Sequence, residues 1–149
     1  MKVKFNKRPL ENLVGQLTAS GKDSRVQVGI LAGGARADSS MTNAEIGYEH
    51  EFGNPSNNLP ERSFLRMPLI FNLRGNLNKD WSKTIQSYGF TTALKQLGVI
   101  AEGTIQKAFA TGGFGFWQPL RPATIARKGS SAILIDTSQL RRSISSRVV

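Results

Sequence analysis

The C-terminal stretch from Trp117 to Val149 constrains the fold more than any other part of the chain, because it is dense in local structure signals. Pro122 suits the first turn of a short helix, where the N–H that proline lacks would have no partner within the helix. Gly129 suits the left-handed position just beyond a helix end. We therefore predict a short helix from Pro122 to Lys128.

A second short helix and a strand are predicted after it. Asp136 can accept hydrogen bonds from the free N–H groups at a helix start, and Gln139, three residues later, can complete a capping box. From Ser143 to Val149 every second side chain falls on one face of an extended strand. Short helices and one strand bury too little surface to be stable alone, so this stretch must pack on a larger unit.

The length and composition fit a single domain that spans residues 1–149. Cysteine is absent, which excludes a disulfide framework and a cysteine metal site. No apolar run is long enough to span a bilayer, and no membrane contact is expected. The start, Met1 to Phe5, lacks the apolar run of a signal peptide. We expect a protein that is made in a cytoplasm and is not exported by the usual route.

The formal charge of the chain is +10, and its second half holds most of it. From Asn76 onward there are 10 Lys and Arg against 3 Asp and Glu, a balance of +7. The residues before it carry 10 against 7, a balance of +3. This asymmetry favours an acidic partner surface or nearby nucleic acid, and a solvated basic face would give the same pattern.

Hydrophobic periodicity and cap signals predict the remaining elements. Thr42 and Glu45 form a capping-box pair at the start of one helix. The predicted elements are strands at 2–6 and Arg25–Leu31, and helices at Pro9–Gly21, Asn43–Phe52, Pro68–Tyr88 and from a Thr91 or Thr92 cap to about Ala110. We expect an α+β fold: a small, mostly antiparallel β-sheet packed against two long helices, with a long β-loop and short C-terminal helices.

The last long helix has a thin side, because Gly98 and Gly103 lie along it. Another helix can approach closely there, either within the chain or from a neighbouring subunit. A glycine-rich loop runs earlier in the chain, from Ala32 to Met41. Three of its residues, Gly33, Gly34 and Arg36, are candidates for contact with another molecule. It lacks the Lys-Ser/Thr pair of a phosphate loop, and we interpret it as a flexible tip that can order on a partner.

The loop from Thr111 to Trp117 combines glycines with three aromatic residues, Phe114, Phe116 and Trp117. On a mobile loop these side chains would expose considerable apolar area unless they were covered. Two interpretations remain open from the sequence. The aromatic residues form either a lid that folds back on the core or a contact surface for another subunit.

No convincing enzyme constellation is present in the sequence. The single histidine, His50, has no second histidine at a metal-binding spacing, and no G-x-S-x-G motif supports a nucleophilic serine. A magnesium site could be assembled on paper from Asp38, Glu45, Glu49 and Glu51, but solvated carboxylates on a helix face are far commoner. We expect no catalytic residue, no cofactor and no metal.

Two blocks of residues share their order and spacing with a known group of proteins. The first block holds Tyr48, Glu51, Phe52, Gly53, Leu59, Pro60, Arg62, Phe64, Leu65 and Arg66. The second holds Trp117, Pro119, Leu120, Pro122, Thr124, Ile125, Lys128, Gly129, Leu134, Ile135, Asp136, Thr137, Leu140, Ser143 and Ile144. Together they resemble the neck or tail-completion (head–tail joining) proteins of tailed bacteriophages, the virion morphogenesis or minor tail protein Z-like family.

The chain departs from this family in two ways. The family often has glycine after Asp-Thr, where this chain has Ser138, which affects the local turn. Some relatives carry the two blocks in the opposite order and continue into a further strand. The order would be interchangeable if the final strand lay beside Arg25–Leu31, so we expect those two strands to be neighbours in one sheet.

The resemblance implies a structural virion protein, located at the neck, that forms a ring at the tail end. A hexamer follows by analogy with the tail tube. The implied partners are other copies of the chain, the head connector with its adaptor or stopper protein, the tail terminator or tail tube, and genomic DNA passing through the channel without sequence readout. The alternative is a basic, non-sequence-specific nucleic-acid-binding module, which would bind any duplex with a steep salt dependence.

Overall fold

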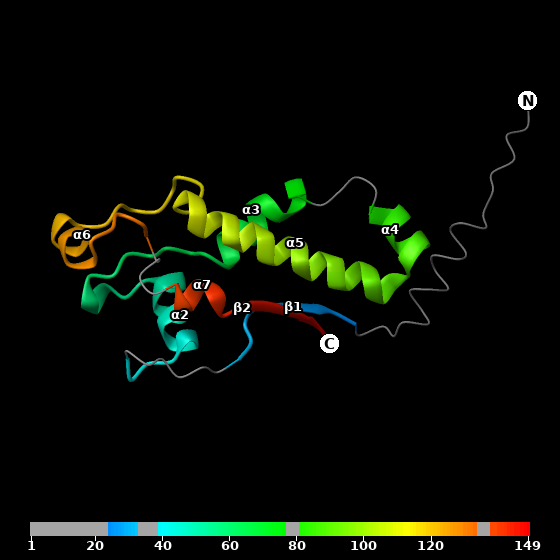
Figure 1. Ribbon diagram of the computed structural model, residues 1–149, viewed down its shortest axis with the longest axis horizontal. Coiled ribbons are helices and arrows are strands. Elements are labelled where there is room, and N and C mark those ends of the chain that lie inside the picture. Colours follow the sequence, from blue (N-terminus) through cyan, green and yellow to red (C-terminus); the bar gives the residue numbers. More distant parts are fainter. Residues whose placement is uncertain (1–23, 33–38, 77–80, 134–137) are drawn as a thin grey trace, which may run out of the picture.

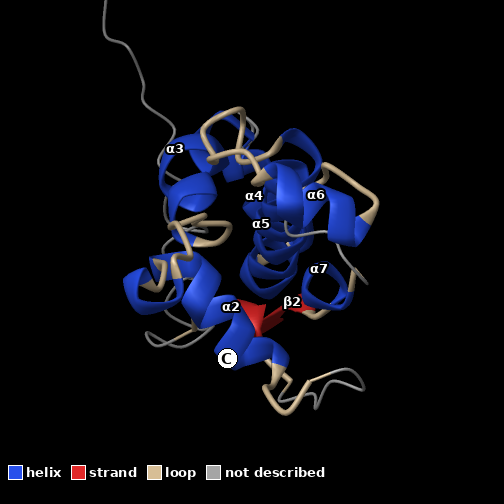
Figure 2. Ribbon diagram, turned by 90° about the vertical axis from the view of Figure 1, so that its left-hand side faces the viewer, coloured by secondary structure: helices blue, strands red, loops and turns tan. Residues whose placement is uncertain are grey.

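The computed structural model describes residues 24–32, 39–76, 81–133 and 138–149. Its fold is α+β, built on the long helix α5 (Phe90–Thr111) and an antiparallel sheet of β1 (Val26–Ile30) and β2 (Ile144–Val148) (Figure 1). The other elements are α2 (Asn43–Phe52), the 3-10 helix η1 (Pro55–Asn57), α3 (Arg66–Asn76), α4 (Trp81–Tyr88), α6 (Pro122–Lys128) and α7 (Gln139–Arg142). Figure 2 looks along α5, with α2 and α3 on one side of it and α6 and α7 on the other.

The sheet joins the two ends of the described chain. Val26 lies opposite Val148, and Ile30 lies opposite Ile144. The ladder continues one pair further, because Arg25 and Val149 exchange backbone hydrogen bonds of 2.8 and 2.9 Å. The expectation that the final strand lies beside Arg25–Leu31 is therefore confirmed.

The core lies where α5 meets the sheet and the start of α3. The α5 side chains that face inward include Leu94, Ala101, Ile105 and Ala108, which fall on one face of the helix. The buried cluster consists of Phe64, Ile105, Phe109, Leu140 and Ile144, with Val28, Ile30, Leu65, Leu69 and Trp117 packed against it. Residues from both motif blocks thus share one core, which explains why the C-terminal stretch is stable against the rest.

Two predictions from local signals are confirmed at the residues expected. The helix from Asn43 to Phe52 begins with a complete capping box, in which Glu45 N–H donates to Thr42 Oγ1 (3.2 Å) and Thr42 N–H donates to Glu45 Oε2 (2.7 Å). The hydrogen bonds from the backbone and side chain of Thr42 lower the pKa of Glu45. The helix from Pro122 ends at Gly129, which adopts the left-handed conformation.

The prediction of two long helices is not confirmed. Where the sequence predicts one helix from Pro68 to Tyr88, the structure has α3, which begins two residues earlier, and the separate α4. Gly75 and Asn76 close α3, and both are poor helix formers in a helix interior. The predicted threonine cap of α5 is also wrong, because this helix begins at Phe90 and Gly89 holds the N-cap position without a side-chain cap.

The predicted capping box of the last short helix is wrong in register. This helix, α7, begins at Gln139, and Ser138 occupies the N-cap position in the left-handed conformation, with no side-chain hydrogen bond to the helix. Gln139 therefore stands at the first helical position, where it cannot close a box with Asp136. Asp136 itself lies outside the described residues, as do the strand and helix predicted at 2–6 and Pro9–Gly21.

The thin side of α5 is used within the chain, and a strand approaches it instead of another helix. A Cβ atom on Gly98 would lie 2.4 Å from Ser146 Oγ and 3.0 Å from Ser146 Cβ. Gly103, on the same helix, is exposed and has no such neighbour within 4 Å. The close approach of β2 therefore requires glycine at 98 but not at 103.

This contrast gives a prediction with an internal control. Gly98→Ala gains helix propensity but must push β2 away, and we expect a net loss of about 1 kcal/mol in the free energy of unfolding. Gly103→Ala has the propensity gain alone, and we expect it to stabilise the protein by up to about 1 kcal/mol. Urea denaturation measures both. Equal effects of the same sign would contradict the packing of β2 on α5.

Candidate functional site

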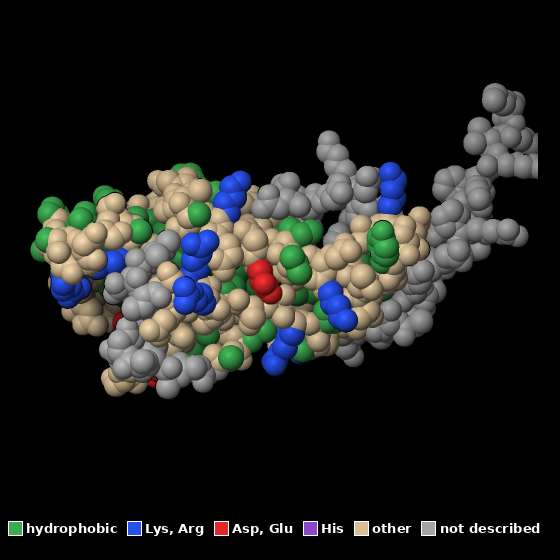
Figure 3. Space-filling view, viewed as in Figure 1, with side chains coloured by type: hydrophobic (Ala, Val, Ile, Leu, Met, Phe, Trp, Pro, Cys, Tyr) green, Lys and Arg blue, Asp and Glu red, His purple; other side chains and the backbone are tan. Residues whose placement is uncertain are grey.

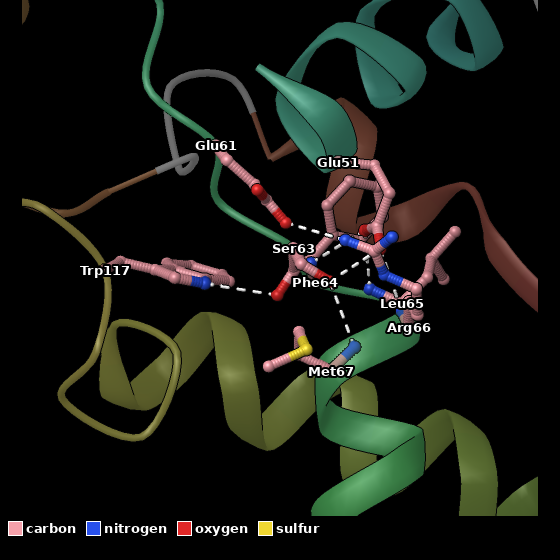
Figure 4. A network of polar contacts seen from close by, with 8 residues as sticks. All are labelled: Glu51, Glu61, Ser63, Phe64, Leu65, Arg66, Met67 and Trp117. Atoms are coloured by element: carbon pink, nitrogen blue, oxygen red, sulfur yellow. Dashed lines mark hydrogen bonds and ion pairs between the residues drawn. The ribbon is translucent and has the colours of Figure 1, made fainter.

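The first motif block is organised around the carboxylate of Glu51, at the end of α2. Its side chain is only 5% exposed, and both oxygens point at the start of α3 (Figure 4). Oε1 accepts from Ser63 Oγ (2.6 Å) and Arg66 N (2.9 Å), and Oε2 accepts from Phe64 N and Leu65 N (2.9 Å each). The first N–H groups of a helix have no partner within it, so Glu51 caps α3 from a neighbouring helix.

Trp117 ties the second block to the first. Its indole Nε1–H donates to the carbonyl oxygen of Ser63 (3.2 Å), and its ring meets Phe109 edge-on at 6.0 Å between centroids. Gly113 lies beneath the indole, where a Cβ atom would be 2.3 Å from the ring. Trp117 therefore folds back on the core, as the lid interpretation predicts.

Arg62 makes a second link between the blocks. Its backbone N–H donates to His50 O (2.8 Å), and its Nε–H donates to Gln118 O (3.2 Å). The side chain is only 5% exposed. Burial lowers the pKa of the Arg62 guanidinium, because leaving water disfavours the charged form.

A groove of about 1010 Å³ lies where the two blocks meet. The end of α2, the chain from Gly53 to Arg62, residues 118–121, the helix α6 and the start of α7 form its walls. Motif residues supply much of the lining: Phe52, Gly53, Leu59, Pro60, Arg62, Pro119, Leu120, Thr124, Lys128 and Leu140. The sequence pattern therefore marks the walls of one concave surface as well as the core beneath it.

Other residues of the two motif blocks lie in the core or at a helix end. Phe64 and Ile144 are buried in the core, and Leu65 packs against it. Ser143 Oγ donates to Leu140 O (2.7 Å) at the end of α7. Asp136 and Thr137 lie outside the described residues, and so do the three loop candidates Gly33, Gly34 and Arg36.

The aromatic residues of the loop from Thr111 to Trp117 differ in their exposure, so neither the lid nor the contact-surface interpretation applies to all of them. Phe116 is 90% exposed, in contrast to the folded-back Trp117. Phe114 is half-buried and has a left-handed backbone (φ 58°), which is uncommon for a bulky residue. Phe116 is thus the aromatic side chain of this loop that is available for another molecule.

Further exposed apolar side chains lie on α2 and on α3, and sequence reasoning did not identify them as exposed. The rings of Tyr48 and Phe52 are tilted by 48° to each other with 4.9 Å between their centroids, and the Arg66 guanidinium lies 5.2 Å from the Phe52 ring centroid. Along α3 the exposed apolar side chains are Met67, Ile70 and Phe71. Their spacing of three and four residues marks one helix face, but a sequence pattern alone does not show that the face points outward.

Within the described chain, no group of three His, Asp or Glu side chains is arranged to hold a metal ion. The carboxylates considered for magnesium have other partners: Glu45 closes the cap, Glu49 accepts from Asn54 Nδ2 (3.0 Å), and Glu51 caps α3. Asp38 lies outside the described residues.

Among the described helices, none is long and apolar enough to cross a membrane. No family model, curated protein or solved structure matches this chain.

Proposed function

We propose that this chain is a structural protein of the bacteriophage neck, which completes the tail and joins it to the head as a ring, hexameric by analogy with the tail. The observation that carries the proposal is the packing of the two motif blocks. Arg62 and Trp117, two of the residues on which the family resemblance rests, make hydrogen bonds between the two blocks, and Glu51, a third, holds the first block together by accepting from the backbone N–H of Phe64. The resemblance therefore involves residues that depend on one another in space.

The exposed apolar side chains support assembly with other subunits. Phe116 lies on the loop after α5, whereas Tyr48 and Phe52 lie on α2 and other exposed apolar side chains lie on α3. On an isolated subunit, each of these groups would leave apolar area in water. Contacts between unlike surfaces of identical subunits are heterologous, and they close into a ring when the rotation between subunits permits. The proposed partners at the two faces of the ring are the head connector complex and the tail.

The distribution of charge suits passage of DNA better than its capture. On the face in Figure 3, Lys and Arg side chains are spread over the surface with other surface between them, and acidic side chains are few. A channel that bound phosphates tightly would hinder passage. Scattered cations are consistent with the proposed contact to DNA without sequence readout.

Electron microscopy of particles made without this protein tests the proposal. We expect DNA-filled heads to accumulate beside separate tails of complete length, and the supplied wild-type protein to restore joined virions. Labelled protein should then lie at the neck. Joined, infectious particles in its absence would refute the proposal.

The nucleic-acid-binding alternative is favoured by one observation, the number of cations on and near α6, α7 and β2, at 121, 127, 128, 141, 142 and 147. It predicts that the isolated subunit binds any DNA duplex and that the logarithm of the affinity falls linearly with the logarithm of salt concentration. Titration of a duplex at several salt concentrations distinguishes it from the neck proposal, under which free-subunit binding is weak.

A further inference from the structure

The groove between the motif blocks carries an excess of positive charge. Four cationic side chains, Arg62, Arg121, Arg127 and Lys128, are part of its lining. Among the described lining residues, Glu61 supplies the carboxylate. Its Oε1 atom already pairs with Arg66 Nη2 at 2.7 Å. A ligand in the groove would therefore meet cations whose charge is not balanced by the described walls.

Arg62 is the cation whose environment most favours an anionic ligand. It is almost fully buried, and its side chain has one hydrogen bond among the described residues, to the neutral carbonyl of Gln118. A buried charge without an opposite charge is costly, and a carboxylate reduces that cost through paired, charge-assisted hydrogen bonds. Arg121 and Arg127 are exposed, so they can contact further negative charges at the rim.

The rest of the lining favours a peptide over a nucleic acid. Leu59, Pro60, Pro119, Leu120 and Leu140 give the walls apolar surface beside the cations. Nucleic-acid phosphates are usually met by exposed cations on a polar surface, and no such apolar contact is needed. Peptides, by contrast, are bound in grooves that take both backbone and alternating side chains.

We propose that this groove binds an acidic peptide segment of a neighbouring protein, with one carboxylate paired to Arg62 and apolar side chains against Pro119 and Leu120. The source of the segment, another protein of the neck, rests on the proposed function. The binding chemistry does not, because it is measured on the isolated protein. Failure of the binding experiment would leave the microscopy test of the neck proposal unaffected.

The experiment uses a short fluorescein-labelled peptide in which aspartate alternates with leucine, and fluorescence anisotropy with the full-length protein. We expect saturable binding, and no saturation with the matched peptide that carries asparagine for aspartate. Arg121→Gln combined with Arg127→Gln should weaken binding by about tenfold. These residues are exposed, so the variant should remain folded, which circular dichroism checks.

A matched variant controls for total charge. Lys95→Gln combined with Lys107→Gln removes the same charge from exposed positions on α5 outside the groove, and we expect affinity to change by less than about twofold in moderate salt. Equal losses in the two double variants would overturn the proposal, as would equal binding of the asparagine peptide or displacement of the peptide by a short DNA duplex.

Discussion

Replacing Glu51 with alanine is expected to lower the free energy of unfolding by about 3 kcal/mol or more, because a buried donor left without its acceptor costs about 1–3 kcal/mol and four donors lose theirs together. The substitution leaves Ser63 Oγ–H and the N–H groups of Phe64, Leu65 and Arg66 without their acceptor. Phe64 is fully buried, so water cannot replace the carboxylate at its N–H without opening the core. The start of α3 therefore loses the acceptor that α2 supplies to it.

Two further variants show whether the carboxylate itself is responsible. Glu51→Gln keeps the shape but presents an NH2 group to backbone donors, so we expect it to recover only part of the loss. Glu61→Ala removes a half-exposed carboxylate from its pair with Arg66 and should change stability by less than about 1 kcal/mol. Chemical denaturation of the monomer measures all three. A loss below about 1 kcal/mol for Glu51→Ala would contradict the interhelical cap.

The sequence predicted correctly those local elements that depend on residues only a few positions apart in the chain. The Thr42–Glu45 box and the short helix between Pro122 and Gly129 each rest on contacts a few residues apart, and both are present at the predicted positions. The pairing of the two strands is a long-range feature, and it was expected only because the order of the motif blocks in the resembling family required it.

The errors arise where local patterns did not decide the structure. Apolar residues at spacings of four from Leu73 to Ile85 continue the helical period across the end of α3, so periodicity alone predicts one helix. Asp136 and Gln139 match a capping box, yet α7 begins too late to use it. The role of Glu51 depends on residues twelve to fifteen positions away, and no propensity or cap rule reads such a contact.

Trp117→Ala is expected to destabilise the monomer by about 3 kcal/mol, at the lower end of the range for truncating a buried aromatic residue, because the indole is half-buried. The variant loses the edge-on contact with Phe109 and the hydrogen bond to Ser63 O, and it leaves a cavity above Gly113. The second motif block would then be held to the first through Arg62 and through the packing of Leu140 and Ile144 with Phe64. Urea denaturation of the monomer measures the loss.

Phe116→Ala, one residue earlier, is the matched variant and tests the opposite role. Because Phe116 is 90% exposed, its removal should change monomer stability by less than about 0.5 kcal/mol. If a neighbouring subunit buries this ring in the proposed assembly, the loss of its apolar area should weaken subunit association by about tenfold or more. Sedimentation velocity of the purified protein and rescue of joined particles measure that effect. Normal assembly of Phe116→Ala would remove this loop from the interface, and a stability loss as large as that of Trp117→Ala would show that the whole loop belongs to the core.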